Sequence, residues 1–431
     1  MGLGKTLQAL ALLLQRAPSG PALVVAPTSV CGNWADEAAR FAPTLNLIDY
    51  RTAERGEVLK SLEPMDVVLA SYGLLQSAAA DFAGVQWRTV VLDEAQAVKN
   101  MVTKRSAAVM DLSGDFRMIM TGTPLENHLG ELWNLFRFLN PGLLGSLEGF
   151  QRRFASPIAE GDADARSRLK RVIQPFLLRR LKEQVLEELP PRTEVTLRVD
   201  LSPEERAFYE ALRQNAVEEI AAAGEGAGGD RRFAIFAQLM KLRRCCCSVS
   251  LVSKDLGAGI PSSKLEAFLS LTADLREGGH RVLVFSQFVD HLQILREALD
   301  AQGVTYQYLD GSTAPQARRA RVQAFQAGEG DCFLISLKAG GTGLNLTGAD
   351  YVIHMDPWWN PAVEDQASDR AHRMGQTRPV TIYRIVARNT VEEKIVELHS
   401  AKRRLAQDLL ENSAYPAALD PRELLELIRE P

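Results

Sequence analysis

Short apolar runs alternate with amphipathic segments in two separate parts of the chain. Near-continuous apolar runs are typical of parallel strands buried on both faces of a sheet, and the segments between them are typical of covering helices. The predicted strands of the first part are residues 22–26, 66–71, 89–95 and 117–122. Those of the second part are residues 281–287, 305–311, 332–336, 351–356 and 380–386. The pattern therefore predicts an α/β fold with two parallel sheets in tandem.

Residues 141–260, between these two parts, have a helical and charged pattern. Ser202, Pro203 and Glu205 are typical of a capping box with proline at the first helical position, and the helix that they begin is expected to end at residues 224–229, which are rich in glycine. Another helical segment follows Val391. The expected segments are a first α/β lobe at 1–140, a helical insertion and linker at 141–260, a second α/β lobe at 261–400 and a helical tail at 401–431.

The composition is that of a folded protein. The chain has 431 residues, of which 46% are hydrophobic, and this is enough for two or three domains with buried cores. It has no run of about 18 uncharged apolar residues that could cross a membrane. Its first segment is amphipathic, with Lys5 near the start, and lacks the cleavage site of a secretory signal. We expect a cytoplasmic protein without a membrane partner.

Cysteine and histidine residues do not follow the spacing of a metal site. The five cysteines are odd in number and lack paired CxxC spacing, so we expect reduced structural thiols. The six histidines are scattered without an HExxH grouping. The sequence therefore indicates neither a disulfide framework nor a metal bound by protein ligands alone.

The formal net charge of −4 does not favour a nucleic-acid partner, for which a basic balance is usual. Basic residues are nevertheless clustered, with seven Lys or Arg among the seventeen positions from Arg166 to Lys182. Shorter basic groups are Arg318, Arg319 and Arg321, and Lys402, Arg403 and Arg404. Each group is either a solvated surface or part of an interface with an anionic partner.

The first residues, MGLGKT, match the end of a phosphate-binding loop and directly precede a predicted helix. Backbone N–H groups around Gly2 and Gly4 would point at phosphate oxygens at the N-terminus of this helix. Lys5 would neutralise the β- and γ-phosphates of a nucleotide, and the Thr6 hydroxyl would be a ligand of Mg²⁺. An unrelated glycine turn is the alternative for this motif taken alone.

The segment VVLDEAQAVKN places two acidic residues, Asp93 and Glu94, at the end of a predicted strand. Ligands of open α/β sheets bind at the carboxyl ends of the strands. Asp93 would hold Mg²⁺ directly or through water, and Glu94 would orient and deprotonate the attacking water. A solvated turn is the alternative, but the GLGKT motif in the same lobe favours a nucleotide site.

A third group, Gln366, Arg370 and Arg373 in QASDRAHRMGQ, is spaced by four and three residues. This spacing predicts one face of a helix in the second lobe. Arginines in such positions are commonly partners in surface salt bridges. Combined with a nucleotide site in the first lobe, they are expected to act as arginine fingers at the γ-phosphate when a cleft between the lobes closes.

Longer motifs follow one another along most of the chain. They are APTSVCGNW, SYGLL, DEAQAVKN, TGTPLENHLGELW, PFLLRRLKEQV, VFSQF, YLDGST, SLKAGGTGLNLTGADYVIHMDPWWNPAVEDQASDRAHRMGQTRPVTIYRIV and TVEEKI. With GLGKT, they resemble in sequence and order the Swi/Snf family of DNA-dependent ATPases of helicase superfamily two, in its bacterial form. The resemblance covers residues 1 to about 410 and implies two RecA-like lobes that flank a helical insertion, with ATP and Mg²⁺ as cofactors.

The resemblance also implies which residues contact DNA phosphates, a contact that does not depend on base sequence. The implied contacts are Pro27, Thr28, Ser29, Ser71 and Tyr72 in the first lobe, and Ser286, Gln287, Lys338, Gly340, Gly341 and Thr342 in the second. Gly343 and Asn345 match positions near the nucleotide, and Thr121 with Thr123 matches the segment that links hydrolysis to lobe movement. Ordinary turn residues are the alternative for these positions.

Two features leave the interpretation open. Trp358 and Trp359 in DPWWNP either contact DNA, for which Trp358 is the candidate, or pack against the lobe. In the family segment that resembles CCCSV, cysteine is followed by histidine and proline, whereas Ser248 and Val249 stand here. This departure argues against a special role for the cysteines.

A complete phosphate loop needs residues before Met1, as do the strand and the adenine contact that precede it in the family. We therefore expect further N-terminal sequence in the intact protein. We also expect that residues 1–431 alone bind ATP weakly and hydrolyse it slowly.

The resemblance implies a monomeric ATPase that moves along double-stranded DNA and displaces bound proteins such as RNA polymerase, in the bacterial cytoplasm at the nucleoid. Two alternatives are a helicase that separates strands and a scaffold that binds DNA or RNA polymerase without hydrolysing ATP.

Overall fold

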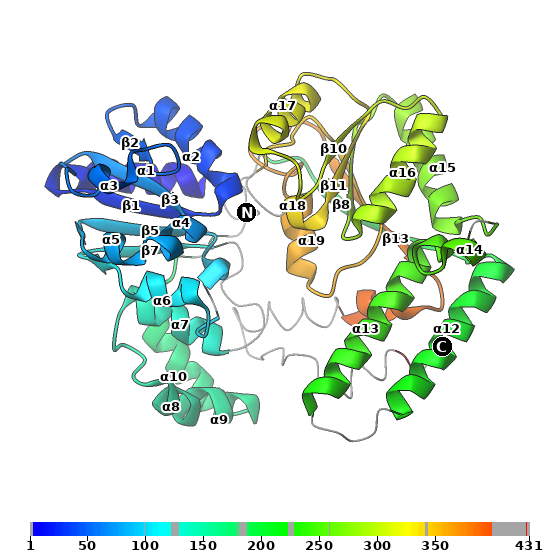
Figure 1. The fold of residues 1–431 in the computed structure, drawn as a ribbon, viewed down its shortest axis with the longest axis horizontal. Helices are drawn as coiled ribbons and strands as arrows, with labels where there is room; N and C mark the ends of the chain where they lie inside the picture. Colours follow the sequence, from blue (N-terminus) through cyan, green and yellow to red (C-terminus); the bar gives the residue numbers. More distant parts are fainter. Residues whose placement is uncertain are drawn as a thin grey trace. The chain divides into compact units, whose positions relative to one another are not determined.

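The computed structural model describes residues 3–98, 100–121, 129–178, 180, 188–222, 228–257, 259–340, 344–398 and 428. The chain divides into two compact units, whose main segments are Met1–Val185 and Leu186–Gln407. Each unit is an α/β structure with its own sheet (Figure 1).

The sheet of the first unit has five parallel strands in the order β2-β3-β1-β5-β7. The strands are β1 (Ala22–Ala26), β2 (Asn46–Asp49), β3 (Asp66–Ser71), β5 (Thr89–Asp93) and β7 (Arg117–Met120). Every residue of β1, β3 and β5 is buried, as expected for strands covered on both faces. The four predicted strands are confirmed. The fifth, β2, was missed because it is a short edge strand without buried residues.

Helices cover both faces of this sheet (Figure 1). On one face, α1 (Lys5–Arg16) and α2 (Thr28–Phe41) pack Leu10, Leu13 and Trp34 against β1, β3 and β5. On the other face, Phe82, Trp87, Val109 and Phe138 form the core. The elements that contribute to this face or follow it are α4 (Tyr72–Ser77), α5 (Ala79–Ala83), β4 (Gln86–Trp87), η2 (Ala95–Val98), α6 (Lys104–Met110), β6 (Ser113–Gly114) and α7 (Leu129–Leu139).

A small helical group completes the first unit. Phe150, Phe154, Leu169 and Trp133 of α7 form its core. Its elements are α8 (Leu147–Phe150), the π-helix η3 (Gln151–Ala155), α9 (Ser156–Ala159), α10 (Ala163–Ile173) and η4 (Gln174–Phe176). This group is the part of the predicted helical insertion that belongs to the first unit.

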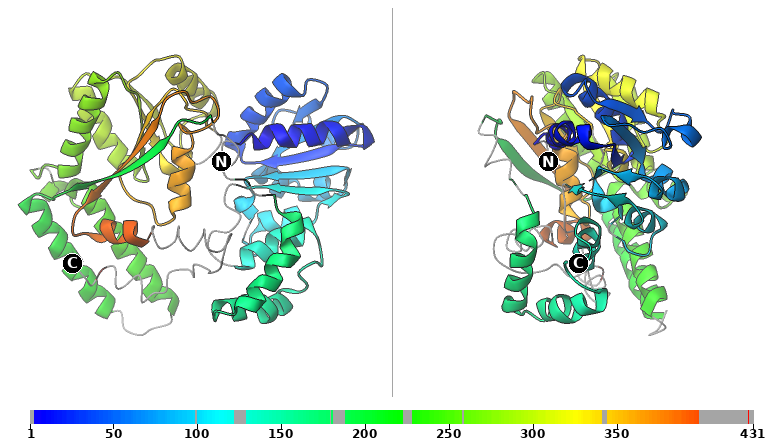
Figure 2. Two further views of the ribbon diagram at one scale, coloured as in Figure 1. Left: turned by 180° about the vertical axis from the view of Figure 1, so that it is seen from behind. Right: turned by 90° about the vertical axis from the view of Figure 1, so that its left-hand side faces the viewer.

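The sheet of the second unit has six parallel strands in the order β10-β11-β9-β12-β13-β8. The strands are β8 (Arg192–Val199), β9 (Val282–Ser286), β10 (Tyr306–Leu309), β11 (Cys332–Ser336), β12 (Tyr351–His354) and β13 (Val380–Ala387). Five of them confirm the predicted strands. The edge strand β8 lies beside β13 although the two are far apart in the sequence (Figure 2, left).

Strand β8 corrects the expectation that residues 141–260 are helical throughout. Its sequence, RTEVTLRV, alternates polar and apolar residues, which is typical of an edge strand with one solvent-exposed face. It therefore lacks the continuous apolar run that was used to predict the other strands. The expected domain limits at residues 140, 260 and 400 remain predictions, whereas the compact units divide between Val185 and Leu186.

Helices also cover both faces of the second sheet. Phe268 of α15 (Ser263–Glu277) and Leu292 and Leu295 of α16 (Val289–Ala301) pack on one face. On the other face lie α17 (Pro315–Gln326), α18 (Leu337–Gly340) and α19 (Pro361–Ser368), with Phe325 and Ala367 in the core. Residues 391–398 form a further helix.

Two long helices, α12 (Pro203–Ala222) and α13 (Gly228–Cys247), pack against each other and are followed by η5 (Val249–Leu251) and α14 (Lys254–Gly257). Their core includes Tyr209, Leu239 and Ile395. The predicted capping box is confirmed, because the Glu205 N–H donates to Ser202 Oγ at 3.2 Å and the Ser202 N–H donates to Glu205 Oε2 at 3.0 Å.

All five cysteines are buried and free. Among the residues that the structure describes, no helix is both long and apolar enough to cross a membrane. The predicted tail at 401–431 lies outside the described residues except for Ile428.

Candidate nucleotide-binding and catalytic site

Helix α1 begins directly after Gly4, whose φ of 66° and ψ of 38° lie in the left-handed region that favours glycine. In the described part of the chain no side chain caps this end of the helix, and no acidic residue occupies its first turn. Its first N–H groups and the positive end of its dipole are therefore available to an anion. Gly2, the other predicted glycine of the loop, lies outside the described residues.

The ammonium group of Lys5 is buried and has no hydrogen-bond partner among the described residues. Burial raises the pKa of the Asp93 carboxyl group, and the nearby positive charge of Lys5 opposes part of this rise. A buried ammonium without a hydrogen-bond acceptor is unfavourable, and a phosphate oxygen would remove this cost. Thr6 follows on α1 and is half-buried. These observations fit the predicted roles of both residues at a nucleotide with Mg²⁺.

Asp93 is the last residue of β5 and only 4% exposed. Trp34 Nε1 of α2 donates to Asp93 Oδ2 at 2.9 Å, and the Glu94 N–H donates to Asp93 Oδ1 at 2.9 Å. Burial raises the pKa of Asp93, and the Glu94 carboxylate raises it further. The carboxyl group is thus held in one orientation at the carboxyl end of the sheet.

Glu94 has a φ of 48°, an unusual conformation for a residue with a side chain. Such backbone strain is found at functional sites, where the surrounding structure maintains it. Gln96 Nε2 donates to Glu94 Oε2 at 2.7 Å, and Thr121 Oγ1 donates to Gln96 Oε1 at 3.1 Å. A chain of hydrogen bonds therefore connects the candidate base to the residue after β7. Thr123, the second residue predicted for that segment, lies outside the described residues.

Sequence reasoning assigned no role to Trp34 or Gln96, although both lie in motifs that it identified, APTSVCGNW and DEAQAVKN. Trp34 is fully buried, and its indole N–H is directed at Asp93. For Gln96 a signal was available, because an amide two residues from Glu94 can donate to its carboxylate. Trp34 lies 59 positions before Asp93, so the sequence held no such signal for it.

The predicted DNA contacts of the first unit differ in exposure. Pro27 precedes α2, Thr28 is exposed and Ser29 is half-buried, at a helix end without a side-chain cap. Ser71 and Tyr72 are 5% and 4% exposed. Ser71 Oγ accepts from the Leu74 N–H and caps α4, and the Tyr72 hydroxyl donates to Asp93 O at 2.8 Å. These two side chains therefore support the site from within, and their contact with DNA remains a prediction.

In the second unit, α19 ends at Ser368, which corrects the prediction that Gln366, Arg370 and Arg373 share one helical face. Gln366 lies on α19, and its buried Nε2 has no partner among the described residues. Arg370 and Arg373 lie in the turns that follow. Arg370 is 7% exposed, and Arg373 Nη1 donates to Leu344 O at 3.1 Å. The spacing of these residues predicted a longer helix because it contains no information about where the helix ends.

The predicted DNA contacts of the second unit are also mixed. Ser286 is fully buried and its Oγ donates to Asp356 Oδ1 at 2.5 Å, so its role in the structure is to hold the end of β9. Gln287 Nε2 is without a partner among the described residues. Lys338 on α18 is exposed, and Gly340 ends that helix. Gly341, Thr342 and Gly343 lie outside the described residues.

Both tryptophans of DPWWNP are half-buried. Trp358 packs against the core that includes Leu283 and Phe325, and Trp359 packs against the core of α12 and α13. The Arg243 guanidinium lies 5.6 Å from the Trp358 ring centroid and 5.0 Å from that of Trp359. These contacts favour packing, and a DNA contact by Trp358 remains a prediction.

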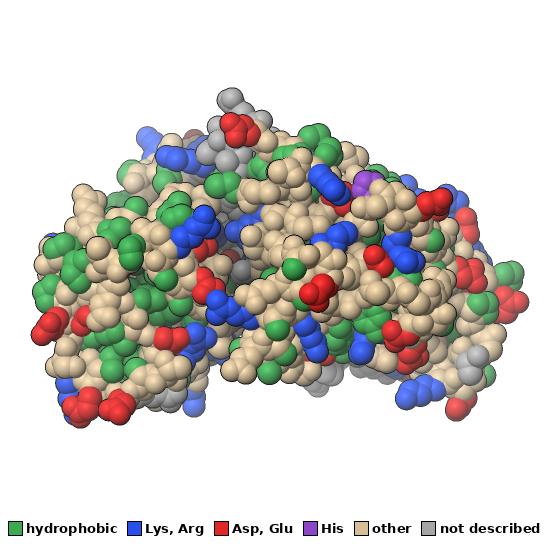
Figure 3. Space-filling view, turned by 90° about the horizontal axis from the view of Figure 1, so that it is seen from above, with side chains coloured by type: hydrophobic (Ala, Val, Ile, Leu, Met, Phe, Trp, Pro, Cys, Tyr) green, Lys and Arg blue, Asp and Glu red, His purple; other side chains and the backbone are tan. Residues whose placement is uncertain are grey.

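Charged side chains of both signs are interspersed on the face in Figure 3. The basic segment 166–182 lies partly on α10, where three of its basic side chains are exposed: Arg168, Lys170 and Arg171. Arg179 and Lys182 of that segment lie outside the described residues. Exposure fits a solvated surface and an interface equally well, so both interpretations remain.

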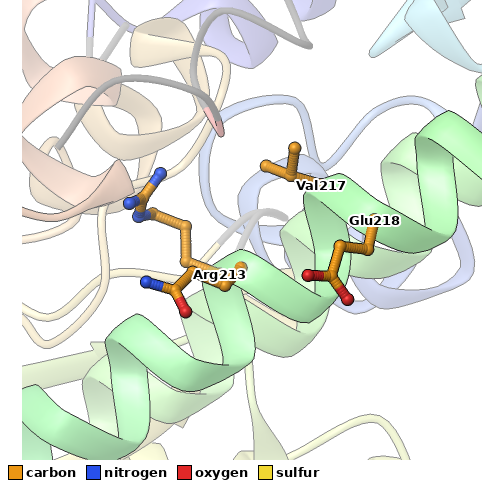
Figure 4. A pocket seen from close by; sticks show the side chains of 4 residues that line it. Arg213, Val217 and Glu218 are labelled. Carbon is orange, nitrogen blue, oxygen red and sulfur yellow. The ribbon is translucent and has the colours of Figure 1, made fainter.

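A hollow on the surface of α12, about 230 Å³ in volume, is lined by Arg213, Gln214, Val217 and Glu218 (Figure 4). None of these residues belongs to the candidate site, and Arg213 Nε donates to Glu210 Oε2 on the same helix at 2.8 Å. This hollow therefore adds nothing to the chemistry assigned to Lys5, Asp93 and Glu94.

Residues 1–251 match the SNF2-related domain, and residues 263–375 match the helicase conserved C-terminal domain. The chain is 40% identical over 443 residues to the putative ATP-dependent helicase/translocase YwqA of Bacillus subtilis, with 99% of this chain and 48% of that protein covered. It is 36% identical over 453 residues to the SWI/SNF-related matrix-associated actin-dependent regulator of chromatin subfamily A member 1 of Homo sapiens, with 100% of this chain and 43% of that protein covered.

A solved structure, the Sulfolobus solfataricus SWI2/SNF2 ATPase core in complex with dsDNA, is 34% identical and is matched over 100% of this chain and 92% of that chain, with a TM-score of 0.46. The chain spans less than half the length of the two curated relatives. The two domain matches together with the bacterial and human relatives show that this chain belongs to the SNF2-related family of ATPases.

Proposed function

We propose that this chain is the motor of a DNA-stimulated ATPase that hydrolyses ATP to ADP and phosphate and thereby moves along double-stranded DNA. The main support is the buried Lys5 ammonium, which lies near Asp93 and has no hydrogen-bond partner among the described residues. It stands at the N-terminus of α1, for which the described part of the chain provides no side-chain cap. Family membership supports the same chemistry. Two relatives are named as a putative ATP-dependent helicase/translocase and as a regulator of chromatin.

The roles at the nucleotide follow from this arrangement. Lys5 and the first N–H groups of α1 bind the β- and γ-phosphates, and Thr6 and Asp93 hold Mg²⁺, which neutralises phosphate charge when bound. Trp34 keeps Asp93 in the orientation that this task needs. Gly2 and Gly343 remain proposed contacts of the nucleotide.

Glu94 is the proposed general base, which orients the attacking water and accepts its proton. Gln96 fixes the orientation of the Glu94 carboxylate through the 2.7 Å hydrogen bond. Through Thr121, the same hydrogen bonds provide a route by which the state of the nucleotide can alter the position of the segment after β7.

We assign Gln366, Arg370 and Arg373 of the second unit to stabilisation of the charge that develops on the γ-phosphate. Arginine fingers typically contribute about 10³-fold or more to the rate. Arg373 Nη1 donates to the Leu344 backbone oxygen at 3.1 Å.

The decisive experiment measures phosphate release by the purified protein without DNA, with linear duplex DNA and with single-stranded DNA. We expect duplex DNA to stimulate release, and we expect DNA affinity to fall with added salt and to vary little between sequences, because the proposed contacts are to phosphates. Phosphate release that duplex DNA leaves unchanged would refute the proposal and favour a scaffold that binds without hydrolysis.

A second experiment separates movement along the duplex from strand separation. A triplex-forming strand is displaced by a duplex translocase, whereas a forked duplex is opened by a strand-separating helicase. We expect ATP-dependent displacement of the third strand only. Opening of the fork would establish the helicase alternative instead.

We further propose that the protein is a monomer, that it displaces DNA-bound proteins such as RNA polymerase, and that it acts at the nucleoid. These proposals are supported by the family resemblance alone. Light scattering of the protein in solution tests the monomer, and release of a stalled RNA polymerase from DNA in the presence of ATP tests the partner.

A further inference from the structure

Three buried side chains of the second unit gather where three separate elements meet. Cys247 ends α13, His291 lies in the first turn of α16, and Asp356 follows β12. The Cys247 sulfur, a His291 ring nitrogen and an Asp356 oxygen all lie within 4.8 Å of one another. Cys247 and His291 are 0% exposed and Asp356 is 2% exposed.

The histidine is the unusual member of this group. Neither Nδ1 nor Nε2 of His291 has a hydrogen-bond partner among the described residues, although the ring is completely buried. Buried polar groups in proteins are almost always satisfied, so both nitrogens of this imidazole are available to a water molecule or an ion. A neutral imidazole has a lone pair that it can donate to a metal ion.

The other two members are held in position by the surrounding structure. Ser262 Oγ donates to Cys247 O at 2.8 Å. Asp356 Oδ1 accepts from Ser286 Oγ at 2.5 Å, and both carboxylate oxygens accept from the Gln287 N–H. Such outer contacts are typical of metal sites, where they orient the ligands.

We propose that Cys247, His291 and Asp356 form a Zn²⁺-binding site within the second unit. Sulfur, imidazole nitrogen and carboxylate oxygen are the three kinds of ligand that zinc takes in proteins, and three protein ligands leave a fourth position for water. Ligand atoms around a tetrahedral zinc lie about 3.3–3.8 Å apart, so a contraction of at most about 1.5 Å brings this group to the required separations.

Binding converts the Cys247 thiol to a thiolate, whose proton is released to solvent, because only the thiolate is a strong zinc ligand. Positively charged side chains near the three ligands oppose the binding of a cation. Arg243 Nη2 lies 3.7 Å from Asp356 Oδ2, and Lys264 Nζ lies close by but is paired with Glu392 Oε2 at 2.6 Å. A bound zinc therefore shares the Asp356 carboxylate with Arg243 and ties the segment of Ser286 and Gln287 more firmly to β12.

The experiment uses the chain of residues 1–431 without a histidine tag. Zinc is measured by mass spectrometry in the purified wild type and in Cys247→Ala and His291→Leu. The matched control is Cys245→Ala, because Cys245 is buried on the same helix two residues earlier and is not a member of the group. We expect one zinc ion per chain in the wild type and the control, and an affinity lower by more than about 100-fold in the two variants.

A second measurement replaces zinc by Co²⁺ in the wild type, so its result does not depend on whether the variants fold. The wild type is expected to show the thiolate-to-cobalt absorption band and the d–d bands of a tetrahedral site. Ser286→Ala, which removes an outer contact, is expected to weaken metal binding by about 10–100-fold. A wild-type chain that takes up neither metal, or zinc retained in both Cys247→Ala and His291→Leu, would overturn the proposal.

Discussion

The substitution Glu94→Gln tests the proposed catalytic base most directly. It removes the ability to accept a proton while keeping nearly the same volume at a residue that is 9% exposed. The amide oxygen can still accept the hydrogen bond from Gln96 Nε2, and glutamine at a φ of 48° is no more strained than glutamate. The variant should therefore fold as the wild type does.

The structure sets the size of both effects. A neutral acceptor in place of the carboxylate weakens the hydrogen bond from Gln96 by about 1 kcal/mol. Loss of the Glu94 charge also removes the repulsion that raises the pKa of Asp93, which offsets part of this cost. Stability should change little, whereas a general base typically contributes about 10²–10⁴-fold to the rate.

The assay measures phosphate release at saturating duplex DNA and, separately, the affinity for a fluorescent ATP analogue with Mg²⁺. We expect turnover to fall by about 10²–10⁴-fold and affinity to stay within a few-fold, because Lys5, Thr6 and Asp93 still hold the ligand. The control is Glu57→Gln, the same change at an exposed glutamate of the first unit. Near-normal turnover in Glu94→Gln would show that Glu94 is not the base.

Three further predictions concern the second unit. Arg373→Ala should lower turnover by about 10³-fold with ATP affinity nearly unchanged, while the exposed Arg388→Ala should alter neither; weakened ATP binding at a normal rate would contradict the finger role. Lys264→Met should lower the free energy of unfolding by about 3–5 kcal/mol, because it leaves the fully buried Glu392 without its ion-pair partner, and Glu392→Gln added to it should restore part of the loss. The control is Glu393→Gln, next to Glu392, because Glu393 forms a more exposed pair with Arg198. This change should lower the free energy of unfolding, measured by denaturant titration for all these variants, by less than about 1 kcal/mol. Burial opposes ionisation of Asp310, but hydrogen bonds from Ser312, Tyr308 and Thr313 outweigh it and lower the pKa from 3.8 to about 2. The ionised carboxylate therefore stabilises the fold fully at pH values above 3.8, and this contribution is lost as the pH falls toward 2. Unfolding of Asp310→Asn and the wild type should therefore differ more at about pH 5.5 than at about pH 3, and an equal difference at both would contradict this reasoning.

Local sequence was sufficient to predict most strands of both sheets. Val24 of β1 pairs with Leu69 on one side and Val91 on the other, and all three are fully buried. A central parallel strand has no solvent face, so its sequence is continuously apolar and recognisable without knowledge of its neighbours. The same reasoning placed Asp93 at the carboxyl end of β5, where the structure has it and where the charge of Lys5 acts on its carboxyl group.

Local sequence was insufficient where the environment comes from distant residues. Strand β8 is identified by its pairing with β13, because its own alternating pattern is weak. The end of α19 at Ser368 also depends on tertiary contacts. The following segment is held by hydrogen bonds such as that from the Leu346 N–H to Arg370 O. A helical spacing of residues shows which side chains could share a face, but not where the backbone turns away.

The candidate sites show the same division at the level of single side chains. The residue types at Lys5, Asp93 and Glu94 were sufficient to predict a nucleotide site, since their chemistry is specific and their motifs are local. The donor from Trp34 to Asp93 spans 59 positions, and Cys247, His291 and Asp356 come from three elements without any common motif. Parallel sheets bring such residues together through long crossover connections, so these contacts depend on the tertiary structure and leave no periodic signal in the sequence.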